Sequence, residues 1–101
     1  MKLLALPVFL LTSLTYATDW SHWLGPNGDG TSSESEWKSE ISDPVWKSKV
    51  GVGFSAVSVA NGKLYTMGHD GKKTGGKETV YCLDSKTGKA MWKHSYPAPL
   101  I

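Results

Sequence analysis

The chain has 101 residues, of which 40% are hydrophobic and 20% charged, and it contains a single cysteine. Its formal net charge of +2 is carried by lysines without any arginine, which does not favour nucleic-acid binding. One cysteine excludes an intramolecular disulfide, and with it a small domain held together by disulfides.

Residues 1–17 have the pattern of a secretory signal peptide. Lys2 precedes an apolar run from Leu3 to Leu14, and the segment ends on the small residue Ala17. The apolar run is too short for a permanent membrane-spanning helix, so a retained anchor is the weaker interpretation. We therefore expect cleavage after Ala17, export to the periplasm or beyond, and no permanent membrane span.

Residues 18–43 are predicted to be an irregular amino-terminal segment. Trp20 and Trp23 lie among three glycines and a proline, a composition typical of a backbone that turns around anchored aromatic rings. Residues 31–42 are rich in serine and glutamate, with Trp37 as their one aromatic residue. They predict a surface connection or a marginal helical turn.

Four strands are predicted downstream, at residues 54–59, 63–67, 79–83 and 90–95. Asn61 and Gly62 form a two-residue hairpin turn between the first two strands. Residues 71–77 contain the glycines and lysine of a phosphate-binding loop. However, Glu78 occupies the position that needs serine or threonine, and a strand follows where a helix is required. A solvated hairpin loop is the better interpretation.

The connection between the last two strands has specific turn chemistry. The Asp84 side chain can accept backbone N–H groups two residues further on, and Gly88 can supply the positive φ that closes a tight turn. Trp92 follows on the next strand and can bury about 150–250 Å² if a neighbouring sheet covers it. An ordinary hairpin with a core tryptophan is the alternative interpretation.

Two segments of the chain are alike. Residues 44–49 (Pro-Val-Trp-Lys-Ser-Lys) align with residues 90–95 (Ala-Met-Trp-Lys-His-Ser), which places Trp46 opposite Trp92. The interval fits one blade of a β-propeller, whose repeats span about 40–50 residues. Because no strands are predicted before Trp46, its own strand is an orphan. We predict that this strand completes a blade by pairing with strands beyond residue 101.

The segment 81–92 resembles the tryptophan-docking motif of the PQQ-like, quinoprotein-type β-propellers. The residues that carry the resemblance are Cys82, Asp84, Thr87, Gly88 and Trp92, with Trp46 as the equivalent tryptophan one repeat earlier. The resemblance implies an all-β fold in which residues 44–101 form a four-stranded antiparallel blade of an incomplete propeller. It also implies that Trp92 packs between adjacent blades and that Cys82 is a small buried side chain.

The opening segment carries a second, weaker resemblance to the same family. Many exported members have a Trp-x-x-Trp pair before a Gly-Pro turn, as Trp20, Trp23 and Gly25-Pro26 do here. Those members usually carry arginine where this chain has Leu24, so any salt bridge of that arginine is lost.

The resemblance implies two kinds of function. Some family members are dehydrogenases that hold pyrroloquinoline quinone and calcium and oxidise alcohols or sugars, whereas others are non-catalytic scaffolds that bind proteins. No catalytic, cofactor-binding or metal-binding residue can be assigned in this segment, and His22, His69 and His94 are predicted to be single surface side chains.

We therefore predict a binding or scaffold module whose partners are the remaining blades of a longer chain and a protein ligand. The alternative is the amino-terminal part of a dehydrogenase whose active site, with quinone and calcium, lies beyond residue 101. A short independent secreted binding domain is the weakest of the three.

Overall fold

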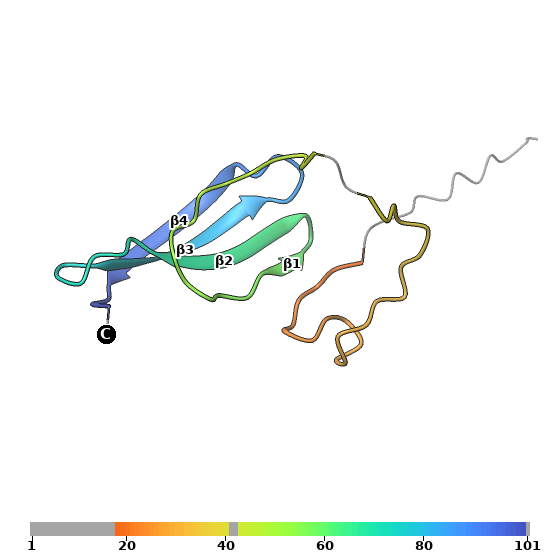
Figure 1. Cartoon of the computed structure of the whole chain (residues 1–101), viewed down its shortest axis with the longest axis horizontal. Helices are drawn as coiled ribbons and strands as arrows, with labels where there is room; N and C mark the ends of the chain where they lie inside the picture. The colour runs from red at the N-terminus through yellow and green to blue at the C-terminus, as the bar shows by residue number, and fades with distance from the viewer. Residues whose placement is uncertain (1–17, 41–42, 101) are drawn as a thin grey trace, which may run out of the picture.

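The computed structural model describes residues 18–40 and 43–100, so the predicted signal peptide lies outside the described residues. It contains one antiparallel sheet of four strands in the order β1-β2-β3-β4. The strands are β1 (Ser58–Ala60), β2 (Lys63–His69), β3 (Lys77–Asp84) and β4 (Ala90–Pro97) (Figure 1). The predicted all-β class is confirmed, and the sheet is open, as in a single blade.

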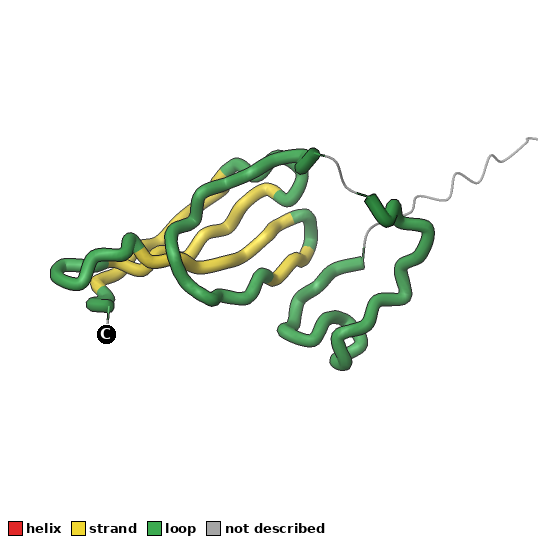
Figure 2. Tube along the Cα trace, in the orientation of Figure 1, coloured by secondary structure: helices red, strands yellow, loops and turns green. Residues whose placement is uncertain are grey.

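Loops make up the rest of the described chain, as Figure 2 shows. The described residues contain no helix, and so none that is long and apolar enough to cross a membrane.

The tight turns follow from residues that tolerate positive φ. Asn61 and Gly62 have φ values of 52° and 74°, the signature of the two-residue turn that joins β1 to β2. The longer loop between β2 and β3 is organised by Asp70, whose carboxylate accepts the backbone N–H groups of Lys72 at 3.0 Å and Lys77 at 3.2 Å. The glycine- and lysine-rich stretch is thus a hairpin loop between strands.

The strand register places one row of aromatic and sulfur-containing side chains across the sheet. Tyr65 pairs with Cys82, and Cys82 pairs with Trp92, so the three side chains lie on the same face. Cys82 is fully buried, as predicted. The pairing shifts by one residue between Cys82 and Leu83, and Met91 is the extra residue on β4.

Two of the predicted strands differ from the structure. Only Ser58–Ala60 of the first strand is paired, because the chain before it turns away from β2 and leaves Phe54 fully exposed. Residues 44–49 form no strand in the described chain, and Trp46 is bound by a turn instead. The pairing of this segment with strands beyond residue 101 stays a prediction. The segment arches across the sheet in Figure 1.

This arching segment, residues 43–57, contacts the far half of β2. Val52 forms a two-way backbone bridge with His69, with N···O distances of 2.8 and 2.9 Å. A Cβ atom on Gly68 would lie 1.6 Å from the carbonyl oxygen of Val50, so only glycine permits this approach. The segment therefore crosses the sheet where β2 has no side chain.

The amino-terminal segment is irregular, as predicted, and only one of its tryptophans is anchored. Trp20 exchanges two backbone hydrogen bonds of 2.8 Å with Val59 on the β1 edge, and its ring lies against Gly25. Trp23 and Trp37 are 75% and 78% exposed, which contradicts the expectation that both rings of the Trp-x-x-Trp pair are held against a surface.

Candidate functional site

The turn between β3 and β4 is the most highly organised site in the described chain. The Asp84 carboxylate accepts the backbone N–H groups of Lys86 at 2.8 Å and Thr87 at 3.0 Å. The N–H of Gly88 donates to the carbonyl of Asp84 at 2.8 Å, and Gly88 has a φ of 74°. The turn chemistry predicted from Asp84 and Gly88 is therefore present.

This turn also stabilises the ionised form of its aspartate. The backbone N–H of Lys86, followed by that of Thr87, lowers the pKa of Asp84 below its ordinary value, because both donors stabilise the negative charge. An ionised Asp84 fixes the loop backbone in the conformation that presents the next carbonyl, that of Ser85.

Trp46 binds to this turn from a distant part of the sequence. Its indole N–H donates to the carbonyl oxygen of Ser85 at 3.0 Å, across a separation of 39 residues. A Cβ atom on Gly88 would lie 2.3 Å from the Trp46 ring, so the ring lies directly on the glycine backbone. The contact needs both a free carbonyl and a residue without a side chain. We call it the indole–turn contact.

The turn is also tied to the start of the sheet. The backbone N–H of Ser85 donates to the carbonyl of Gly62 at 3.0 Å, which connects the β3–β4 turn with the β1–β2 turn. Ser85 thus donates to one turn and accepts from Trp46. Sequence reasoning missed Ser85, because any residue type supplies a carbonyl and only the turn geometry selects this one.

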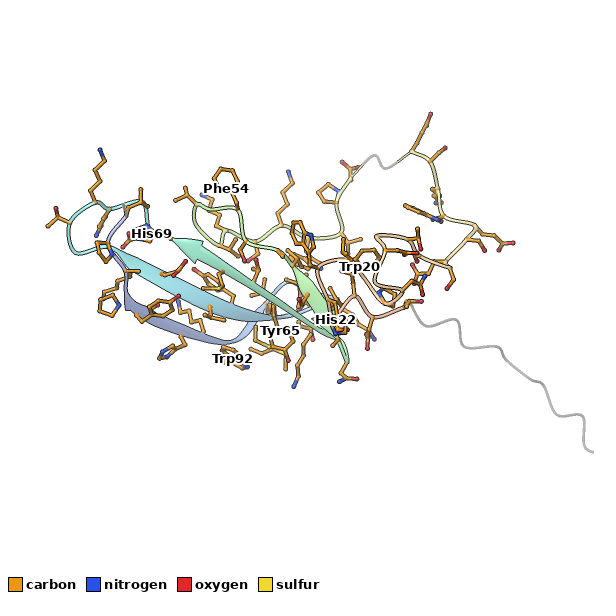
Figure 3. All side chains as sticks on the ribbon, turned by 90° about the horizontal axis from the view of Figure 1, so that it is seen from below. Trp20, His22, Phe54, Tyr65, His69 and Trp92 are labelled. Carbon is orange, nitrogen blue, oxygen red and sulfur yellow. The ribbon has the colours of Figure 1, made fainter. Side chains whose placement is uncertain are left out.

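Trp92 lies on the sheet face, away from the β3–β4 turn. Its ring centroid is 6.3 Å from that of Tyr65, with the planes tilted by 53°, and Figure 3 shows the two rings together on one side of the ribbon while Phe54 stands out from the other. Trp92 remains 49% exposed. The structure therefore brings Trp46, Asp84, Thr87 and Gly88 together and leaves Trp92 outside that group.

A second group lies at the opposite end of the sheet, around His69. This side chain is buried, which corrects the expectation of a surface histidine. Its Nδ1 accepts the N–H of Gly71 at 2.9 Å, and its Nε2–H donates to the carbonyl of Ala98 at 2.6 Å. The alternation along β2 places His69 on the face of Tyr65, where Tyr65 and Met67 are only partly buried. The strand pattern therefore does not predict the burial of His69, which results from its contacts with Gly71 and Ala98.

His69 and its β3 neighbour Glu78 line a concavity of about 520 Å³. The remaining lining residues come from the arching segment and the end of the chain: Val52, Gly53, Phe54, Ala98, Pro99 and Leu100. The Glu78 carboxylate accepts the hydroxyl of Tyr96 at 2.5 Å, and this hydrogen bond raises the pKa of Tyr96. Both polar groups of the concavity have protein partners.

Among residues 18–40 and 43–100 there is no group of three side chains able to hold a metal ion. Comparisons with the models of known protein families, with curated proteins and with solved structures gave no match.

Proposed function

We propose that this chain is part of an exported PQQ-like β-propeller repeat protein that acts as a binding or scaffold module. The observation that carries the proposal is the indole–turn contact. Trp46 and Trp92 occupy equivalent positions in two similar segments, and Trp46 binds the turn that precedes Trp92. A contact that links one repeat to the next is what a row of blades requires.

The exposed face supports the same proposal. Tyr65 and Trp92 lie side by side on one sheet face, and Trp92 is 49% exposed there. An aromatic row of this kind is stabilised when a second sheet packs against it at about 10 Å. The partners that we propose are further blades of a longer chain, and beyond them a protein ligand.

The coding sequence beyond codon 101 provides the first test. We expect further Asp-x-x-Thr-Gly-x-x-x-Trp segments at intervals of about 40–50 residues. A reading frame that ends without any such segment would contradict the proposal and favour a short independent secreted domain.

Calorimetry on the product of that complete reading frame separates the scaffold from the dehydrogenase. We expect no stoichiometric heat signal when pyrroloquinoline quinone and Ca²⁺ are added together. A stoichiometric signal at micromolar concentration would instead assign the protein to the quinone-dependent enzymes. Calcium alone serves as the control for binding that does not involve the quinone.

A further inference from the structure

The chain contains two Asn-Gly pairs, and their surroundings differ. Asn27-Gly28 lies in the amino-terminal segment, and Asn61-Gly62 forms the turn between β1 and β2. An asparagine side chain can react with the backbone nitrogen of the next residue. Glycine leaves this nitrogen accessible, because it has no side chain. The rate then depends on how firmly the fold holds the two reacting groups, which are the glycine N–H and the asparagine amide.

The fold holds both reacting groups of the first pair. The N–H of Gly28 donates to the carbonyl of Gly25 at 3.1 Å. The side-chain amide of Asn27 donates to the backbone carbonyl and to the hydroxyl of Thr31, at 3.3 and 3.4 Å. These hydrogen bonds must break before the two groups can react, so the structure protects Asn27.

The second pair has no such protection. Asn61 and Gly62 are exposed, and a Cβ atom on Gly62 would meet nothing within 4 Å. Within residues 18–40 and 43–100, neither the Gly62 N–H nor the Asn61 side-chain amide has a hydrogen-bond partner. Outside the strand pairing, the turn is held through other groups. The backbone N–H of Asn61 donates to Asp19 at 3.4 Å, and the Gly62 carbonyl accepts the N–H of Ser85 at 3.0 Å.

We propose that Asn61 is a self-modification site, which deamidates much faster than Asn27. The Gly62 nitrogen attacks the side-chain carbonyl carbon of Asn61 and forms a new C–N bond. The amide nitrogen leaves as ammonia with the proton of the Gly62 N–H. One water molecule then opens the resulting succinimide ring at either of its two C–N bonds. Cleavage on the side-chain carbonyl gives aspartate, and cleavage on the main-chain carbonyl gives isoaspartate. No electrons are transferred, and the net change is the replacement of NH by O.

The two products affect the turn differently. Aspartate followed by glycine suits the same two-residue turn as asparagine, so the aspartate product keeps the backbone. Isoaspartate adds one carbon to the backbone inside the turn, which displaces the Gly62 carbonyl from the N–H of Ser85. Both products place a new carboxylate beside a cavity of about 590 Å³, whose lining includes Asp19 and Lys86.

The modification therefore acts on the attachment of the amino-terminal segment. Asp19 accepts the N–H of Asn61, and the next residue, Trp20, exchanges two backbone hydrogen bonds with Val59. A second negative charge repels Asp19, and the altered turn removes its donor from its present position. We expect the segment to detach from the β1 edge more readily after the reaction. The chain thus carries a slow, irreversible timer at this attachment.

Peptide mapping of the full chain during long incubation at neutral pH tests the reaction. Trypsin cuts after lysine, so Asn61 lies in the peptide of residues 50–63 and Asn27 in the peptide that ends at Lys38. Mass spectrometry measures the replacement of NH by O in each peptide. We expect Asn61 to react at least about tenfold faster, because Asn27 and Gly28 must first break their hydrogen bonds.

The same chain unfolded in guanidinium chloride is the matched control, and both pairs should react at similar rates there. Equal rates in the folded chain overturn the proposal. A preference for Asn61 that persists in the unfolded chain also overturns it, because the fold would then not be the cause. The route has its own test, since only the succinimide gives isoaspartate. A modified peptide that an aspartate-specific protease cuts completely indicates direct hydrolysis and overturns the proposed reaction.

Hydrogen exchange measures the effect on the amino-terminal segment. In deamidated protein the amides of Trp20 and Val59 should exchange about threefold faster or more than in fresh protein. Asn61→Asp is the control, because it carries the new charge without the additional backbone carbon, and it should show a smaller increase. Unchanged exchange in the deamidated protein overturns the proposed timer.

Discussion

Replacing Gly88 by alanine tests the indole–turn contact most directly. Two costs are expected. Gly88 has a φ of 74°, and holding alanine in this left-handed region costs about 1–2 kcal/mol. The added Cβ would also lie 2.3 Å from the Trp46 ring, so Trp46 has to leave the turn.

Losing Trp46 from the turn removes one hydrogen bond and the packing of a half-buried ring. The hydrogen bond contributes about 0.5–1.5 kcal/mol, and the packing of the ring contributes about as much again. The sum is smaller than the cost of about 3–5 kcal/mol for a fully buried tryptophan, because this ring is only half-buried. We expect Gly88→Ala to destabilise the chain by about 3–4 kcal/mol in total, of which about 2 kcal/mol comes from Trp46.

Gly62→Ala is the matched control. Gly62 also has a φ of 74°, but a Cβ atom there meets nothing within 4 Å, so only the backbone cost applies. Urea unfolding followed by far-ultraviolet circular dichroism measures both variants. Equal losses of stability would refute the reasoning. A third chain, Trp46→Ala, completes a double-mutant cycle in which Gly88→Ala and Gly62→Ala should become equally costly.

Three further predictions concern other parts of the chain. Trp92→Ala should reduce the free energy of unfolding by about 1.5–2.5 kcal/mol, as measured with urea. This is half the usual loss for a buried tryptophan, because the ring is 49% exposed. A loss of about 3–5 kcal/mol is expected only where another sheet covers the ring. Asp84 has a lowered pKa when folded, so its stabilising effect is present above the unfolded pKa and is lost as the pH falls through the folded pKa. Asp84→Asn should thus reduce the free energy of unfolding at pH 7, and this variant should lose less further stability than the original chain below about pH 4. Urea unfolding at a series of pH values measures both effects. A pH dependence equal to that of the original chain would contradict this role. The intact mass of the exported protein should place its mature amino terminus at Thr18. An exported protein that keeps residues 1–17 would contradict the prediction of a cleaved signal peptide.

The sheet could be predicted from the sequence because local chemistry determines it. Asn61-Gly62 and the Asp84–Gly88 turn set the hairpins, and alternating side chains give the strands between them. The predicted strand ends fall short of the observed ones. β2 continues through Gly68 and His69, because these residues pair with Thr79 and Glu78 of β3, and Val52 adds a backbone bridge to His69.

The position of residues 43–57 could not be predicted in the same way. A pattern of Val45, Trp46 and Lys47 fits a strand locally, but a strand also requires a neighbouring edge. The structure provides a turn instead, and the Trp46 N–H pairs with the carbonyl of Ser85. The six residues singled out by the docking resemblance therefore separate into those at the turn, including Trp46, and those on the sheet, Cys82 and Trp92.

The indole–turn contact also has a consequence for the order in which the chain folds. The hairpins β1–β2, β2–β3 and β3–β4 join neighbouring strands, so they close over short loops, whereas Trp46 must wait for a turn that lies 39 residues further along the chain. During synthesis the ring of Trp46 emerges well before its partner. We expect Trp46→Ala to accelerate unfolding and to leave the folding rate nearly unchanged, because the contact forms after the rate-limiting step. Stopped-flow kinetics measures both rates, and a slower folding rate in this variant would place the contact in the folding nucleus. The last contact to form on folding would then also be the first to open on unfolding.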